Sequence, residues 1–233
     1  MLLPKQQTGA TLLKRYKRFL ADVQLEDGSI LTVHCPNSGS MLGCSSPGLP
    51  VIISRSNNPK RKYPWTLELV KLDQYWVGVN TSLTNKLVHE ALQNGQINNF
   101  AAISSIQPEV KISEKSRLDF MLEHRDKTQK TYLEVKNCSL AHNGTALFPD
   151  AVTARGTKHL EELIRLLQQG HDAALIFCIQ REDALSFRPA ADIDPKYADT
   201  LHKAKKAGVK LLAYKAHVSP NEIYIQQEVP VSV

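Results

Sequence analysis

The first 80 residues alternate between apolar and polar positions with a period of two, which is typical of β-strands. Runs with this pattern cover residues 14–26, 29–35, 51–56, 63–72 and 75–80. Asp27-Gly28 lies between the first two runs, and an Asp-Gly pair in this position is a strong hairpin signal. The segment contains no convincing helix, so the pattern predicts about five strands. Because a closed sheet leaves few open edges, we expect a small five-stranded barrel.

The period changes from two to 3.6 at Asn80-Thr81, and we place a domain boundary there. From Ser82 onward, apolar residues recur at spacings of three and four and stop before Gly95, which predicts a helix. Further strands are expected at 109–113, 116–124, 130–138, 173–180 and 209–218, with an edge strand near 221–229. One helix is expected to follow the loop at 148–153, and another is expected to cover residues 195–207. Residues 81–233 therefore predict a mixed α/β domain.

The net charge of +6 is confined to the predicted barrel. Residues 1–62 contain nine basic and three acidic side chains, whereas the remaining 171 residues contain 20 of each. Such asymmetry favours a polyanion-binding N-terminal module, although a solvated basic surface would look the same. The basic charge favours an oligonucleotide-binding barrel, and an SH3-like barrel fits the strand count nearly as well.

Several protein classes are disfavoured by the rest of the composition. No segment reaches the roughly 18 apolar residues needed for a membrane span, and the N-terminus lacks the apolar core of a signal peptide. The four cysteines are dispersed without CxxC spacing, which suggests reduced thiols. We therefore expect a cytoplasmic protein that does not interact with membranes.

Candidate chemistry lies on two predicted strands of the second domain. Side chains alternate along a strand, so Glu134 and Lys136 share one face while Leu133 and Val135 share the other. The preceding strand can pair with this one as a hairpin. If the numbers of each two paired residues sum to 253 or 255, Asp119 lies on the same face as Glu134 and Lys136. The same register would place Leu118 and Phe120 in one core with Leu133 and Val135.

Two carboxylates beside a lysine suit metal-dependent hydrolysis of a phosphodiester. Carboxylate oxygens are hard ligands for Mg²⁺, and a bound cation lowers the pKa of a coordinated water. A neighbouring lysine can help position that water and stabilise developing charge. An ion pair between Glu134 and Lys136, with Asp119 solvated, is the plainer alternative that spacing alone leaves open.

Longer motifs resemble the sugar fermentation stimulation protein A family of bacteria and archaea over almost the whole chain. These motifs are HCPNSGSMLG at 34–43, LEVKN at 133–137, FPDAVTARGTKHLEEL at 148–163 and FRPAADIDPKYADTL at 187–201. The resemblance implies an N-terminal oligonucleotide-binding-like barrel over 1–80 and a C-terminal PD-(D/E)xK nuclease-like domain over 81–233. It also implies DNA binding and a link to the regulation of sugar (maltose) metabolism.

The resemblance carries the nuclease-like motif onto Asp119, Glu134 and Lys136, with Mg²⁺ or Mn²⁺ as the implied cofactor. Asp119 and Glu134 would hold the metal, and Glu90 is the candidate for a further acidic ligand from a preceding helix. The residue before Asp119 is Leu118, where the superfamily motif has proline.

Basic residues that could contact DNA fall into three groups. Aromatic residues flank the first group on its predicted strand, which suits single-strand binding, although Phe19 could equally belong to the core. The second group adjoins a turn, and the third opens a predicted helix, where free backbone N–H groups favour phosphate. The three groups are Arg15, Lys17 and Arg18; Lys60, Arg61 and Lys62; and Arg155 with Lys158.

Three functional hypotheses remain open on the sequence. The first is a DNA-binding protein with a Mg²⁺-dependent nuclease site. The second is a DNA-binding regulator that keeps the nuclease fold without cleaving. The third is a protein that uses the same motifs for another phosphate-containing ligand.

Overall fold

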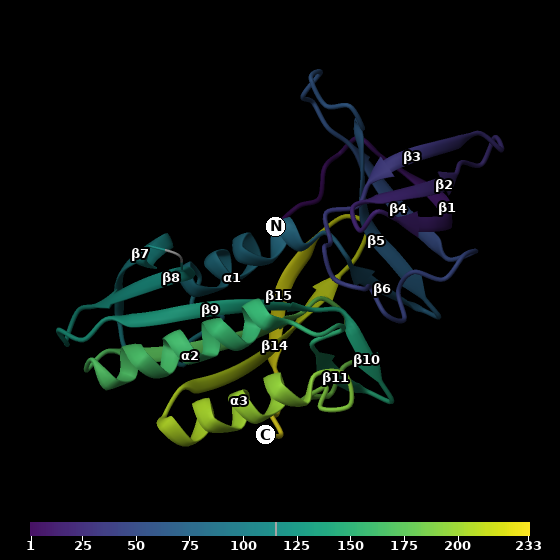
Figure 1. Ribbon diagram of the computed structural model, residues 1–233. Helices are drawn as coiled ribbons and strands as arrows, with labels where there is room; N and C mark the ends of the chain where they lie inside the picture. The colour runs from purple at the N-terminus through teal and green to yellow at the C-terminus, as the bar shows by residue number, and fades with distance from the viewer. Residues whose placement is uncertain (115) are drawn as a thin grey trace.

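A computed structural model describes residues 1–114 and 116–233 and divides the secondary structure between two large sheets (Figure 1). The N-terminal sheet has the order β3-β2-β1-β4-β5-β6, and the C-terminal sheet has the order β15-β14-β12-β9-β8-β7. No helix in the described part of the chain is long and apolar enough to cross a membrane.

The N-terminal sheet consists of two antiparallel three-stranded units, β1-β2-β3 and β4-β5-β6, which are joined by antiparallel pairing of β1 with β4. Its strands are β1 (Gln7–Tyr16), β2 (Leu20–Gln24), β3 (Ile30–His34), β4 (Pro50–Arg55), β5 (Trp65–Leu72) and β6 (Tyr75–Gly78). The hairpin predicted at Asp27-Gly28 is confirmed, since Gln24 pairs with Ile30 across it and Gly28 has a φ of 84°. Apolar side chains from all six strands form one core.

Two expectations for this sheet were wrong. It has six strands, because the first apolar run bends back between Tyr16 and Leu20, where Lys17 and Arg18 adopt positive φ values of 49° and 63°. Nor does the sheet close into a full barrel. Strands β3 and β5 meet only at the pair His34 and Thr66, so their edges remain largely separate.

Helix α1 (Thr84–Gln93) opens the C-terminal part after a short 3₁₀ turn at Thr81–Leu83. Asn80 caps this turn by accepting the backbone N–H of Ser82. The other helices are α2 (Ala154–Gln168) and α3 (Pro195–Ala207), and the strands are β7 (Ile103–Ser113), β8 (Ser116–His124), β9 (Thr131–Cys138), β12 (Asp172–Ile179), β14 (Lys210–Val218) and β15 (Ile223–Glu228). The edge strand expected near 221–229 is β15.

The C-terminal sheet is covered on both faces. Its central strands β9, β12 and β14 run parallel, and β8 joins β9 antiparallel. Along β12, Leu175 and Phe177 belong to the core under α2 and α3, whereas Ile176 and Cys178 belong to the core under α1. A central parallel strand buried on both faces explains the continuous apolar run in the sequence.

A small third sheet was missed by the sequence analysis. It contains β10 (Leu140–His142), β11 (Thr145–Phe148) and β13 (Ser186–Pro189) in the order β10-β11-β13. These strands have only three or four residues, too short for the alternation of apolar positions to be read. Strands β10 and β11 lead the chain from the end of β9 to the start of α2 (Figure 1), and β13 lies between β12 and α3.

The starts of α2 and α3 are tied together by one carboxylate. Asp194 caps α3 by accepting the N–H of Tyr197 at 2.9 Å, and it also accepts the N–H of Thr153 at 2.8 Å. Thr153 in turn caps α2 through the N–H of Gly156. The beginning of α2 therefore has a fixed position relative to α3.

The two parts of the chain contact each other at several points. The backbone N–H of Gly78 donates to the carbonyl of Gln180 (2.8 Å), and a Cβ at Gly78 would lie 2.3 Å from Gln180 Oε1. The first residues also pack on the C-terminal part: Leu3 lies in its core, and Leu2 forms a bridge with Glu222.

Candidate functional site

Asp119 occupies a gap where strands β8 and β9 separate. Their pairing includes Phe120 with Leu133 and confirms the predicted register, with residue numbers summing to 253. Beyond Phe120 the pairing ends, and the Asp119 carboxylate accepts the N–H of Val135 through Oδ2 at 2.7 Å. The side chain therefore takes the place of the next backbone partner.

Local backbone distortion also corrects the predicted core. Glu109 of β7 has a φ of 54°, and no pairing is formed between it and Asp119, although the flanking residues do pair. Leu118 packs in the core under α2 and α3, while Phe120 packs in the core under α1. The expectation that Leu118 and Phe120 share one core was therefore wrong, because this irregularity interrupts the strand alternation.

Glu134 is buried against the start of α2. Its Oε1 accepts hydrogen bonds from Lys136 Nζ at 2.5 Å and from His159 Nδ1. Its Oε2 is buried and accepts no hydrogen bond from any residue the structure describes. A buried carboxylate oxygen without a partner is unfavourable, and a bound cation would satisfy it.

The two carboxylates differ in their electrostatic environment. Burial, followed by the nearby charge of Glu134, raises the pKa of Asp119 to about 6. Burial alone would also raise the pKa of Glu134, but His159 and Lys136 outweigh it and the pKa is lowered. Two mutually repelling carboxylates at a buried point are the arrangement that a divalent cation relieves.

Two residues at the site were not assigned to it from the sequence. Asn85, in the first turn of α1, donates to Asp119 Oδ1 at 2.7 Å. His159, in the second turn of α2, forms a hydrogen bond with Glu134 Oε1. Its place in the motif FPDAVTARGTKHL was the available signal; Asn85 had none beyond its position on the helix.

Glu90 does not complete a three-carboxylate site. It lines a cavity of about 430 Å³ together with Asp119, but its carboxylate binds the N-terminal ammonium of Met1 at 3.0 Å. Within residues 1–114 and 116–233, no cluster of three or more His, Cys, Asp or Glu side chains is arranged to hold a metal ion. The acidic pair of Asp119 and Glu134 still suits Mg²⁺, which typically binds through one or two protein carboxylates and several waters.

A groove of about 820 Å³ adjoins the acidic pair on the α2 side. Asp119 and His159 line it, as do Arg155 and Lys158 from the first turns of α2. Both basic side chains are exposed. The structure therefore brings these two predicted phosphate-binding residues to the same groove as Asp119.

The basic residues predicted to contact DNA from the N-terminal sheet differ in whether their side chains are exposed or already hydrogen-bonded. Lys17 and Arg18 lie exposed in the β1–β2 turn instead of on a strand, and Phe19 beside them is also exposed. The Arg15 guanidinium donates to the carbonyls of Arg18, Asn37, Gly39 and Ser40. Arg15 is therefore occupied in shaping this loop.

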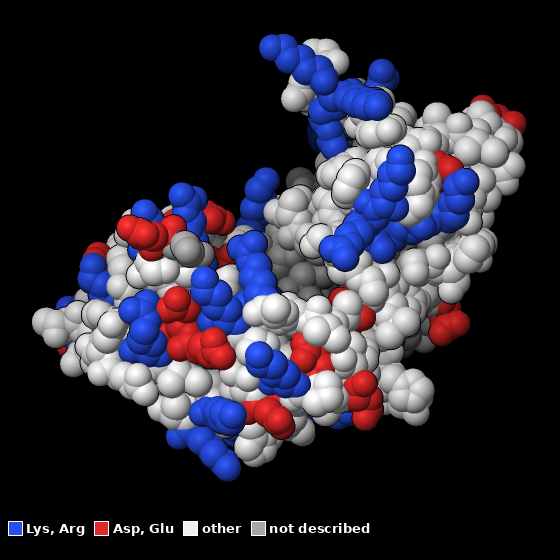
Figure 2. Space-filling view, viewed as in Figure 1, with Lys and Arg blue, Asp and Glu red and all other residues white. Residues whose placement is uncertain are grey.

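The second basic group lies on the β4–β5 loop, the long hairpin that projects from the N-terminal sheet in Figure 1. Lys60 and Lys62 are exposed, whereas Arg61 bonds to Thr66 Oγ1 and His34 Nδ1. Figure 2 shows Lys and Arg side chains on both lobes beside the hollow that separates them.

Comparison with known proteins agrees with this two-part architecture. The family model described as "SfsA N-terminal OB domain" matches residues 13–79, and the model described as "Sugar fermentation stimulation protein RE domain" matches residues 82–222. The chain belongs to the sugar fermentation stimulation protein family. This confirms the resemblance drawn from the sequence motifs.

Relatives in this family match along nearly the full chain. A sugar fermentation stimulation protein homolog from Desulfotalea psychrophila is 56% identical over 211 residues, covering 91% of this chain and 89% of the relative. One from Pelobacter propionicus is 53% identical over 231 residues, covering 99% of both. The solved structure of Pyrococcus furiosus SfsA in complex with Ca²⁺ shares the fold, with a TM-score of 0.91, 24% identity, and coverage of 100% of this chain and 98% of that one.

Proposed function

We propose that this protein binds DNA and hydrolyses its phosphodiester bonds at a site formed by Asp119, Glu134 and Lys136, with Mg²⁺ or Mn²⁺ as cofactor. The observation that carries the proposal is the buried Glu134 Oε2 without a hydrogen-bond partner, adjacent to an acidic neighbour with a raised pKa. The Ca²⁺ named with the Pyrococcus furiosus structure is consistent with a divalent-cation site in this fold.

Each residue of the acidic site and of the adjoining groove has a role that follows from its position. Asp119 and Glu134 would hold the cation, which when bound lowers the pKa of a coordinated water and stabilises charge on the phosphate. His159 and Lys136 fix Glu134 Oε1, which leaves Oε2 for the cation. Arg155 and Lys158 line the adjoining groove, where they would receive phosphates of the strand.

A cleavage assay tests this function. The protein is incubated with single-stranded and duplex DNA and RNA in Mg²⁺, in Mn²⁺ and in EDTA. We expect cleavage that requires metal and falls at least 100-fold in Glu134→Gln and in Lys136→Met. Glu161→Gln changes an exposed carboxylate on α2 and serves as the matched control. No cleavage of any substrate, or equal cleavage by Glu134→Gln, contradicts the proposal.

A second candidate is a DNA-binding regulator that does not cleave. It is favoured by the finding that, among the described residues, no third acidic side chain joins Asp119 and Glu134 in an arrangement that could hold a metal ion. Binding in Ca²⁺ without cleavage in Mg²⁺ or Mn²⁺ would support this function over the first.

Salt dependence identifies the basic residues that touch DNA. Each phosphate contact contributes roughly 0.7–0.9 to the slope of log K against log salt. We expect the double variant Lys60→Ala, Lys62→Ala to reduce the slope by about 1–2. The pair Lys203→Ala, Lys206→Ala on α3 provides the control, and an equal reduction in both would place the DNA elsewhere.

A further inference from the structure

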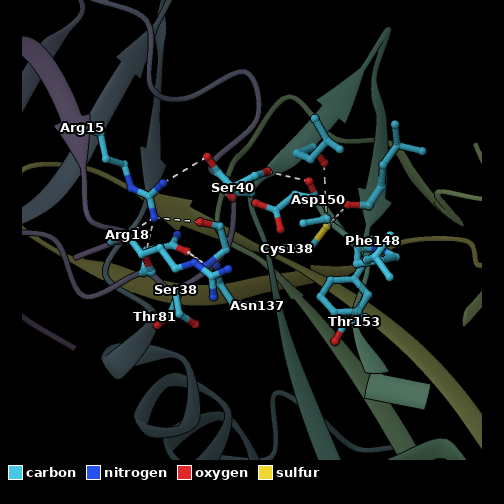
Figure 3. A pocket seen from close by; sticks show the side chains of 18 residues that line it. Arg15, Arg18, Ser38, Ser40, Thr81, Asn137, Cys138, Phe148, Asp150 and Thr153 are labelled. Carbon is cyan, nitrogen blue, oxygen red and sulfur yellow. Dashed lines mark hydrogen bonds between the residues drawn. The ribbon is translucent and has the colours of Figure 1, made fainter. Parts of the chain in front are cut away.

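A second cavity, of about 510 Å³, lies between the N-terminal sheet and the C-terminal part (Figure 3). Its volume falls within the roughly 300–1,000 Å³ of typical small-ligand pockets. One wall is the loop at 37–40, and the opposite wall is the segment 147–153 before α2. Three of the sequence motifs, at 34–43, 133–137 and 148–163, therefore meet around one cavity.

Asp150 joins the two walls. Its Oδ2 accepts the N–H of Met41 at 2.8 Å, and its carbonyl accepts the Ser40 hydroxyl at 2.5 Å. The loop approaches so closely that a Cβ at Gly39 would lie 2.8 Å from Asp150 Oδ1. Oδ1 itself accepts no hydrogen bond from the described residues, so an acceptor remains available in the cavity.

The cavity combines three kinds of recognition. Arg18 provides an exposed cation on its N-terminal side, since its guanidinium, unlike that of Arg15, donates no hydrogen bond to the described residues. Phe148 provides a half-buried aromatic ring, and the Ser38 hydroxyl adds a polar group. A ligand that suits this set has an anionic group, a flat ring and N–H donors, which is the chemistry of a nucleotide.

The cavity and the acidic site are neighbours in the fold. Asn137, which lines the cavity, follows Lys136 directly on β9. Thr153, on the opposite wall, caps α2, whose next turns carry Arg155, Lys158 and His159 into the groove beside Asp119. A strand held in that groove would therefore pass close to the cavity.

We propose that the interdomain cavity binds one unstacked nucleotide of the DNA strand that enters the acidic site, with its base at Phe148 and Asp150 and its phosphate at Arg18. The protein then selects single-stranded or locally unpaired DNA over intact duplex. This inference rests on the proposed function and adds the substrate class.

The test compares two single strands of equal length and charge in EDTA, one with bases and one composed of abasic nucleotides. Binding is followed by the fluorescence anisotropy of a terminal dye. Phosphate contacts alone would bind both strands equally, whereas stacking of one base contributes about 1–3 kcal/mol, or 5- to 150-fold in affinity. We expect the base-bearing strand to bind at least 5-fold more tightly, and duplex DNA to gain no such advantage.

Two variants locate the effect. Phe148→Leu and Asp150→Asn should each reduce the preference for the base-bearing strand to less than 2-fold. Leu185→Ala, at an exposed apolar residue outside the cavity, should leave it unchanged. Because Phe148 also packs on Phe177 and Tyr197, melting temperatures of all variants are compared first. Asp150→Asn provides the second readout if Phe148→Leu does not fold.

The outcomes separate this inference from the proposed function. Equal binding of both strands, or a preference that survives in both variants, overturns the nucleotide site while metal-dependent cleavage stands. Free nucleoside monophosphates that bind more tightly than the strand would assign the cavity to a free nucleotide and overturn the strand assignment. If neither strand binds and nothing is cleaved, both proposals fail.

Discussion

Asp119 offers a direct test of the electrostatics of the acidic pair without assuming any catalytic activity. Its pKa rises from 3.8 to about 6 in the folded protein, chiefly through burial and then through Glu134. A carboxyl whose folded pKa is raised binds its proton more tightly in the native state than in the unfolded state. Stability therefore falls as the pH rises from about 4 to about 6, and the loss persists above pH 6.

The magnitude follows from the two pKa values. Each pKa unit corresponds to about 1.4 kcal/mol, so ionised Asp119 destabilises the metal-free protein by up to about 3 kcal/mol at pH 8. Asp119→Asn removes this charge and keeps the shape. Its amide oxygen can still accept the N–H of Val135, and the Asn85 amide can rotate to accept from the new NH₂ group. We expect the variant to be about 1–3 kcal/mol more stable at pH 8 and to show no gain at pH 4.

The assay is urea unfolding in EDTA, followed by circular dichroism at pH 4 and pH 8. Asp126→Asn is the matched control, because Asp126 is exposed in the segment between β8 and β9. Added Ca²⁺ should stabilise the native protein at pH 8 more than it stabilises Asp119→Asn, since a cation that binds only the folded state raises its stability. An Asp119→Asn variant that is no more stable at pH 8, or whose difference is the same at both pH values, would refute the reasoning.

Three further predictions concern packing. Gly78→Ala places a Cβ against the buried Gln180 side chain and should destabilise the protein by about 1–3 kcal/mol. Thermal melts should show that adding Gln180→Ala recovers much of the lost stability. If the double variant recovers none of it, the predicted contact is contradicted. Asp194→Ala removes hydrogen bonds at the starts of both α2 and α3 and should cost about 2 kcal/mol in urea unfolding, whereas a change below about 0.5 would be inconsistent with a shared cap. All four cysteines are buried, and burial raises the pKa of Cys178 to about 12 and of Cys44 to about 11, so a thiol reagent at pH 8 should modify them only after unfolding; fast labelling of the native protein would refute this.

The sequence predicted most of the individual elements of this protein because their signals are local. Alternation of apolar positions located β8, a continuous apolar run located β12, and the helix expected over residues 195–207 is α3. Because side chains alternate along a strand, Asp119 and Glu134 can share a face only if the numbers of paired residues sum to an odd value. The pairing of Phe120 with Leu133, whose numbers sum to 253, confirms this. These features depend on residues close together in the chain, where backbone geometry alone relates their side chains.

Only the tertiary structure decided which long-range partners the residues acquire. The turn at Lys17 and Arg18 needs positive φ in residues with no turn signature, and the sheet edges that would close the barrel meet at one pair. Asn85 and His159 join the acidic pair from helices that precede and follow it, and no periodicity relates them to Asp119 or Glu134. The sequence by itself therefore determined most of the elements, the family and the residues of the acidic pair. The surroundings of that pair, and the cavity beside it, were decided by packing between segments far apart in the chain, because burial and charge at a site depend on all the elements that enclose it.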